Sequence, residues 1–146
     1  MNRDFVEILS ELSAAGAEFL VVGAHALAAH GRPRATGDLD IWIRPTPENA
    51  ARVWQALSRF GAPLKDLSVD DLSTPGVVFQ IGLAPYRIDI LTEISGVSFD
   101  EAWPHRIINE FAGQSYAVIG KLELIRNKRA AGRAQDLVDA DALERQ

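Results

Sequence analysis

The run Asp38-Leu-Asp-Ile-Trp-Ile43 constrains the fold of this chain more than any other segment. Its polar and apolar residues alternate as they do in a β-strand with one buried face. Residues two apart share a face, so Asp38 and Asp40 project side by side while Leu39 and Ile41 face the core. Two carboxylates held this close repel each other unless a cation compensates them. Magnesium, which prefers oxygen ligands and often shares them with substrate phosphates, is the simplest candidate.

An Asp-x-Asp pair alone is weak support for a metal site, because the pattern is short and is more often a solvated turn or a helix cap. Here the alternation that follows the pair favours a strand, so the two carboxylates are expected on a rigid element. The pattern therefore indicates phosphoryl or nucleotidyl chemistry.

Composition narrows the class of protein. The chain has 146 residues, 47% of them hydrophobic and 24% charged, without repeats or linkers, so we expect one folded domain over residues 1–146. A net charge of −5 argues against non-specific duplex binding, although a nucleic-acid end remains open as a substrate. The absence of cysteine excludes disulfides and thiolate zinc sites.

The apolar stretch at 19–29 is too short to span a bilayer, and the N-terminus is unlike a signal peptide. We expect a cytoplasmic protein with no membrane partner.

The remaining periodicity predicts an α/β (α+β) fold, with a mixed sheet of four or five strands, helices packed on one face and a C-terminal helix pair. Asp89 is expected on the strand beside the aspartate strand, within about 10 Å of Asp40, since ligands of one magnesium ion lie about 2.1 Å from it. A polar, turn-rich segment is expected at 65–76, a loop at 31–37 and a hairpin turn at 82–85. The expected helices are 4–15, 23–30, Pro47–Phe60, 98–103, Lys121–Ala131 and 133–144, and the expected strands are 18–22, Asp38–Ile43, 77–81, 86–91 and 115–118.

Gly23 marks a junction at which a strand leads directly into a helix. Such a junction presents free backbone N–H groups and the positive end of a helix dipole, and a glycine lets a phosphate approach closely. The alternative is a tight turn in which the glycine only supplies backbone freedom.

Three groups of residues together resemble a known superfamily. Gly23-Ala24, then Asp38-Leu39-Asp40, then Asp89 on a later strand look like the minimal signature of the nucleotidyltransferases that include polymerase-beta-like enzymes. The run at 21–43, together with Lys128-Arg-Ala-Ala-Gly-Arg-Ala-Gln-Asp136, is similar to the small bacterial AbiEii-like nucleotidyltransferases of abortive-infection and toxin–antitoxin systems. The resemblance covers roughly residues 18–142.

The resemblance implies a role for each matching residue. Asp38, Asp40 and Asp89 would bind Mg²⁺ or Mn²⁺, and Asp89 would also help to activate the acceptor hydroxyl. Gly23 and Ala24 would hold the triphosphate. Lys128 and Asp136 would join the site from the C-terminal helices.

The implied reaction is metal-assisted transfer of a nucleoside monophosphate from a nucleoside triphosphate to an acceptor hydroxyl. The implied acceptor is an RNA end such as that of a tRNA, a protein or a small molecule. A cognate toxin or antitoxin is the implied protein partner.

Two departures from the superfamily pattern bear on activity. Ala24 stands where serine or glycine is usual, so a hydroxyl contact to phosphate is missing. The segment Arg133-Ala-Gln-Asp136 lacks the proline and lysine that commonly follow this arginine.

Several side chains have two interpretations. Arg32 and Arg34 either grip the triphosphate or are solvated loop residues. Trp42 either stacks on a base or, as packed tryptophans more often do, fills the core. The basic residues between Lys121 and Arg133 are interpreted as the solvent face of a helix. His25 and His30 are interpreted as structural, because their spacing is poor for joint metal ligation.

Two hypotheses from different classes remain. In the first, the chain is an active, metal-dependent nucleotidyltransferase. In the second, it is a catalytically silent relative that serves as a binding partner or antitoxin. A calcium-binding structural loop is a weaker third, since the ligand pattern of an EF-hand is missing.

Overall fold

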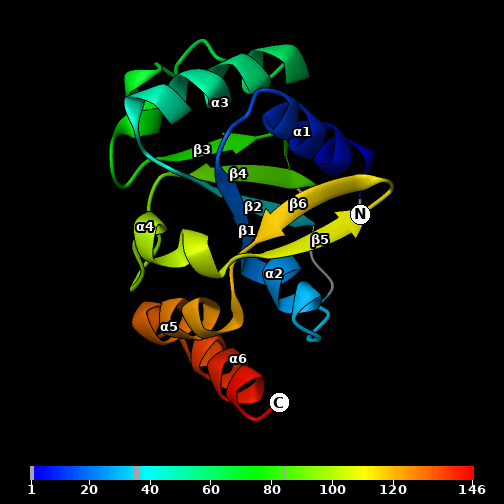
Figure 1. Ribbon diagram of the computed structural model, residues 1–146, viewed down its shortest axis with the longest axis vertical. Coiled ribbons are helices and arrows are strands. Elements are labelled where there is room, and N and C mark those ends of the chain that lie inside the picture. The colour runs from blue at the N-terminus through cyan, green and yellow to red at the C-terminus, as the bar shows by residue number, and fades with distance from the viewer. Residues whose placement is uncertain (1, 35–36, 84) are drawn as a thin grey trace.

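A computed structural model of the chain describes residues 2–34, 37–83 and 85–146. Its centre is one mixed sheet in the order β3-β4-β2-β1-β6-β5 (Figure 1). Strand β2 pairs antiparallel with β1 and parallel with β4, while β1 pairs parallel with β6. The hairpins β3–β4 and β5–β6 complete the two sides. The strands are β1 (Phe19–Val22), β2 (Asp38–Ile43), β3 (Val78–Ile81), β4 (Arg87–Leu91), β5 (Ile107–Phe111) and β6 (Gln114–Val118).

The sheet has one strand more than the four or five expected, and the additional strand is β5. Four of its five residues are exposed, so β5 lacks the alternation that marks a half-buried strand. It forms because a tight turn folds it back on β6, with Ala112 and Gly113 at φ 51° and 79°. Both angles are positive, as in the turns that close two-residue hairpins, yet Ala-Gly is not a sequence signal for such a turn.

The helices lie where the periodicity predicts them, within one or two residues. Helices α1 and α3 lie on one side of the sheet, and the C-terminal pair α5–α6 lies on the other (Figure 1). Helix α3 begins after Thr46, whose side chain accepts a hydrogen bond from the N–H of Asn49, and ends at the left-handed Gly61. The helices are α1 (Arg3–Ala14), α2 (Gly23–Ala29), α3 (Pro47–Phe60), α4 (Phe99–Ala102), α5 (Lys121–Ala131) and α6 (Ala134–Glu144), with short 3₁₀ turns η1 (Asp70–Ser73) and η2 (Trp103–His105).

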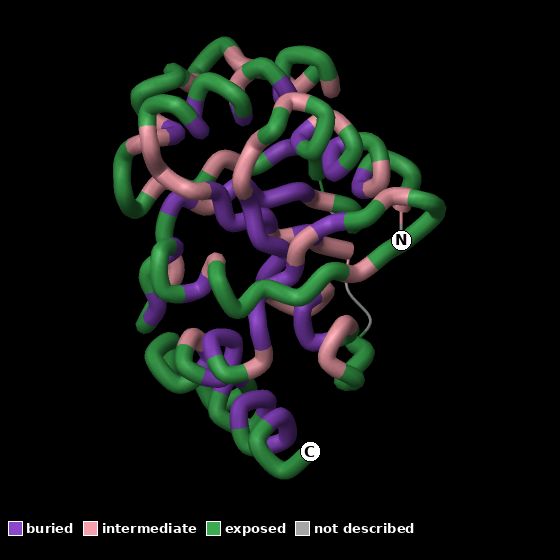
Figure 2. Tube along the Cα trace, viewed as in Figure 1, coloured by how far each residue is buried: buried purple, intermediate pink, exposed green. Residues whose placement is uncertain are grey.

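The core fixes the register of the aspartate strand. Leu39, Ile41 and Ile43 are completely buried on β2, and buried residues follow the central strands (Figure 2). Burying each such side chain stabilises the fold by about 1.5–3 kcal/mol. A slip of one residue would turn Asp38 and Asp40 into this core, so burial of the apolar set also fixes the direction of the acids.

Parts of two expected loops lie outside the described residues. These are Ala35 and Thr36 in the loop at 31–37, and Ala84 in the turn at 82–85. Among the helices that the structure describes, none combines the length and the apolar character needed to cross a bilayer.

Candidate active site

Strands β2 and β4 bring the three predicted acids together. Asp40 lies directly opposite Asp89 in the parallel register, and Asp38 lies opposite Arg87. Neighbouring strands are about 4.8 Å apart, and paired residues point to the same face, so the three carboxylates are neighbours within the expected 10 Å. Their role as metal ligands remains a prediction.

Arg87 is bound to two of these acids, and it is absent from the residues predicted above. Its Nε donates to Asp89 Oδ1 at 2.9 Å, and its Nη2 donates to Asp89 Oδ2 at 3.2 Å and to Asp38 Oδ2 at 3.3 Å. The contact with Asp89 is bidentate, the geometry in which guanidinium and carboxylate bind most strongly. The available signal was the alternation in Arg87-Ile-Asp89, which repeats that of Asp38-Leu-Asp40 and places both polar residues on one face.

This arrangement disfavours the ionised form of Asp40. Burial, together with the negative charges of Asp89 and Asp38, raises the pKa of Asp40 to about 6, and Arg87 counteracts these effects in part. A hydrogen bond between the carboxyls of Asp40 and Asp89 also favours the protonated form. Among the described residues, one guanidinium contacts this group of three carboxylates, and a further cation would relieve the repulsion between them.

The donor chemistry of the three acids suits magnesium, but their present arrangement is not a ready-made metal site. Within residues 2–34, 37–83 and 85–146, no three acidic or histidine side chains are grouped as ligands of one ion. The cation that the acids hold here is the guanidinium of Arg87.

Gly23 lies directly against Asp40. Its φ is +68°, and a Cβ atom at this position would lie 2.1 Å from Asp40 Oδ2. Both the backbone conformation and the close approach therefore require glycine. Ala24 follows within α2 and offers no side-chain hydroxyl to the site.

A second cluster of charges lies on α5 and α6. Lys128 is only 8% exposed, and its Nζ lies 3.4 Å from Asp136 Oδ1 and 3.5 Å from Asp139 Oδ2. The interpretation of the 121–133 basic residues as a solvent face is therefore wrong for Lys128. It is buried because both acids turn inward from α6, which neutralises the charge that burial would otherwise penalise.

Two arginines complete this cluster. Arg133 Nε donates to Asp136 Oδ2 at 2.7 Å, and both terminal nitrogens of Arg34 donate to Asp139. Burial opposes ionisation of Asp136 and Asp139, but hydrogen bonds from these arginines and the charge of Lys128 outweigh it and lower both pKa values. Arg34, for which triphosphate binding and a solvated loop position were both left open, here ties the segment before β2 to α6. Asp139 is the second residue that the sequence prediction missed.

One pocket of about 250 Å³ joins the two clusters. Of the residues predicted for the site, four line it: Gly23, Asp40, Lys128 and Asp136. Asp38 and Asp89 stand beside Asp40 on the sheet. The pocket therefore has an acidic wall formed by the sheet and a mixed, partly basic wall formed by α5 and α6.

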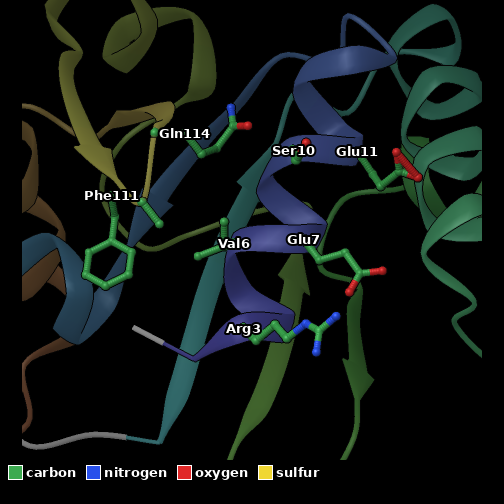
Figure 3. A pocket seen from close by; sticks show the side chains of 9 residues that line it. Arg3, Val6, Glu7, Ser10, Glu11, Phe111 and Gln114 are labelled. Carbon is green, nitrogen blue, oxygen red and sulfur yellow. The ribbon is translucent and has the colours of Figure 1, made fainter.

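A larger pocket of about 800 Å³ lies elsewhere, between α1 and the β5–β6 hairpin (Figure 3). Its walls include Arg3, Glu7, Glu11, Phe111 and Gln114, and none of the predicted site residues lines it. The volume of a pocket alone does not identify a reactive site. We place the candidate site at the smaller pocket because four of the predicted site residues line it.

Trp42, His25 and His30 make contacts within the fold, although Trp42 Nε1 and His25 Nε2 are buried without a hydrogen-bond partner among the described residues. Trp42 is 1% exposed and packs edge-on against Phe99, with ring centres 5.1 Å apart, so the core interpretation holds. His30 Nε2 lies 2.8 Å from the carbonyl oxygen of Ile119, and His25 packs edge-on against Phe5.

Comparisons with solved structures identify the fold. The chain aligns over 98% of its length with 89% of a Thermotoga maritima protein provisionally classed as a nucleotidyltransferase, with a TM-score of 0.62 and 17% identity. It aligns over 99% of its length with 96% of the lincosamide antibiotic adenylyltransferase LnuA, solved with lincomycin bound, with a TM-score of 0.60 and 11% identity. No family model matches the chain. No curated protein matches it either. The chain therefore has a nucleotidyltransferase-like fold.

Replacing Gly23 by alanine is expected to destabilise the protein more than replacing Gly16. Both glycines have positive φ, at +68° and +72°, but only Gly23 faces a neighbour within 4 Å. Alanine in the left-handed region costs about 1–2 kcal/mol at either position. The overlap with Asp40 should add about 1–3 kcal/mol at position 23 only. Urea unfolding of the two variants measures the difference, and the double variant Gly23→Ala/Asp40→Ala should recover much of it. Equal losses in the two single variants would contradict the close contact.

Stability should depend on pH through Asp40. Because its pKa is about 6 in the folded protein and near 3.8 in the unfolded chain, its ionisation destabilises the fold as pH rises through this window. Asp40→Asn removes that loss, so the variant should match the wild type near pH 3.5 and exceed it at pH 8, by up to about 3 kcal/mol. Thermal melts in EDTA at several pH values test this, with the exposed Asp66→Asn as control. A constant difference between Asp40→Asn and wild type at all pH values would refute the assignment.

Proposed function

We propose that the protein transfers a nucleoside monophosphate from a nucleoside triphosphate to an acceptor hydroxyl. The observation that carries the proposal is the pairing of Asp40 with Asp89 on neighbouring strands, where Asp40 lines a pocket together with Gly23 and Lys128. The fold supports it, since one structural neighbour is an adenylyltransferase. We further propose dependence on Mg²⁺ or Mn²⁺, because three carboxylates with one guanidinium retain a negative excess.

Each residue of the candidate site has a proposed role. Asp38, Asp40 and Asp89 are the proposed ligands of the metal, which when bound supplies charge stabilisation at the reacting phosphate. The acceptor oxygen attacks the α-phosphorus, the bond to pyrophosphate breaks, and Asp89 takes the hydroxyl proton. Backbone N–H groups at Gly23 and Ala24 bind the triphosphate. Lys128 and Asp136 form the opposite wall of the pocket, where Lys128 offsets phosphate charge.

The acceptor is proposed as an RNA end, a protein or a small molecule. LnuA acts on a lincosamide antibiotic and was solved with lincomycin, which makes a small hydroxylated molecule a concrete acceptor to test. The AbiEii-like resemblance adds a role in a toxin–antitoxin system, with a cognate toxin or antitoxin as partner.

One observation favours a second candidate function. Arg87 already binds both oxygens of Asp89 and one oxygen of Asp38. A guanidinium held permanently in this position would make the acids a structural ion cluster, and Ala24 removes a phosphate contact. The chain would then be a catalytically silent relative that acts through a protein partner.

Labelled-nucleotide transfer separates the two functions. Each α-³²P-labelled nucleoside triphosphate is incubated with Mg²⁺, protein and, in turn, total RNA, a cell proteome and hydroxylated antibiotics. The wild type should label one acceptor, and Asp40→Asn should reduce the rate by at least about 100-fold because a metal ligand is lost. Lys128→Ala should reduce it less. Melting temperatures of the same preparations exclude unfolding as the cause.

The outcome that refutes the site is transfer by Asp40→Asn at the wild-type rate. The Asp66→Asn variant, which loses an exposed carboxylate elsewhere, should transfer normally. If no acceptor is labelled by the wild type, the silent function is favoured instead.

Metal and nucleotide should bind cooperatively. Because protein and phosphate oxygens share the coordination sphere of magnesium, the ion should bind weakly alone and at least about tenfold more tightly with a nucleoside triphosphate. Isothermal titration calorimetry with Mg²⁺ and with Mn²⁺, each with and without nucleotide, measures the coupling. Equal affinities under the two conditions would indicate a structural ion.

A further inference from the structure

Arg87 stands out because it occupies the oxygens that the proposed function requires. Its side chain is 35% exposed, whereas that of Asp89, to which it binds with two nitrogens, is 10% exposed. The guanidinium therefore covers Asp89, whereas the side chain of Asp38 remains 41% exposed and Asp40 lines the pocket. A ligand that reaches Asp89 must first move Arg87.

The other cations near the pocket are already engaged. Lys128 lies between Asp136 and Asp139, and Arg133 is bound to Asp136. Among the described residues, Arg87 is the cation that contacts Asp38 and Asp89. It carries one positive charge against three carboxylates, so a divalent ion would compensate the face better but would compete for the same oxygens.

We propose that Arg87 is the resident counter-ion of the acidic face and that it exchanges Asp38 and Asp89 for the triphosphate when the metal-bound nucleotide enters. This inference rests on the proposed function and adds to it a residue that couples metal binding to nucleotide binding.

The coupling follows from what each ligand offers to the guanidinium. A metal ion alone breaks three hydrogen bonds, repels Arg87 and provides no new partner for it. A nucleotide brings phosphate oxygens, which match the planar fork of arginine as well as a carboxylate does. Free metal should therefore bind poorly, and the metal–nucleotide complex should bind well.

The first experiment measures Mn²⁺ binding by electron paramagnetic resonance, with and without a mixture of α,β-methylene analogues of the four nucleoside triphosphates. Arg87→Gln should bind Mn²⁺ alone about tenfold more tightly than wild type, since a nearby positive charge has been removed. The enhancement by nucleotide analogue should fall by a similar factor. Arg59→Gln removes one positive charge from the exposed face of α3. It should change neither the affinity for Mn²⁺ alone nor the enhancement by nucleotide analogue.

Arg87→Lys separates charge from geometry. Lysine keeps the positive charge but lacks the planar fork, so it should retain weak Mn²⁺ binding and lose part of the nucleotide coupling. If this variant behaves as wild type in both measurements, the exchange of bidentate partners is refuted.

A second readout uses the wild-type protein, so it does not depend on a variant folding. The Arg87 Nε–H resonance in ¹⁵N NMR spectra, assigned by its loss in Arg87→Lys, should be protected from exchange in EDTA. Mg²⁺ with the analogue mixture should shift it, and Mg²⁺ alone at the same concentration should shift it much less. An unchanged resonance at saturating Mg²⁺ and analogue would overturn the proposal.

The outcomes also separate this inference from the proposed function. Nucleotide transfer by the wild type, with equal Mn²⁺ affinity in wild type and Arg87→Gln, would keep the function and reject the role of Arg87. Tighter Mn²⁺ binding by Arg87→Gln without any transfer by the wild type would keep the counter-ion role and reject the enzyme.

Discussion

Burial of the apolar face of β2 is the constraint on which the site depends. Leu39, Ile41 and Ile43 are fully enclosed, and their burial leaves Asp38 and Asp40 no direction except the opposite face. The parallel pairing with β4 then sets Asp89 beside Asp40. The electrostatic cost of bringing these acids together is met by the hydrophobic free energy of the strand that carries them.

The electrostatic free energy of the carboxylates differs between the sheet and the C-terminal helices. On the sheet, the pKa of Asp40 is raised because its carboxyl is buried and because the negative charges of Asp89 and Asp38 lie beside it. On the C-terminal helices, Asp136 and Asp139 have lowered pKa values because each has its own arginine and both contact Lys128. Among the described residues, the carboxylates on the sheet wall thus outnumber the cations that contact them. The carboxylates on the helix wall are paired with Lys128 and two arginines. The first wall is therefore the one at which we propose that a cation binds, while the charged groups of the second wall already pair with one another.

Much of the fold could be predicted from the sequence, because strong periodicity and clear helix ends determine it. Thr46, Pro47 and Gly61 bound α3 as their residue types indicate, and Asp38–Ile43 forms the strand that its alternation predicts. Strand β5 could not be predicted, since four of its five residues are exposed and it forms only as a partner of β6. The contacts of Arg87 with Asp38 and of Arg34 with Asp139 join different elements, which no local pattern records. The contact of Arg87 with Asp89 lies within β4, where the alternation of the strand already placed both residues on one face.

The bond between Arg34 and Asp139 has a consequence for how the molecule is made. It joins the segment before β2 to the last helix, and Lys128 and Asp136 of the same cluster line the pocket opposite Asp40. The acids of the sheet leave the ribosome long before α6 does. During synthesis the sheet can therefore form with its acidic face open, and the pocket closes only when the C-terminal helices have emerged and docked. The order of translation thus completes the pocket last, after the strands that carry its acidic wall.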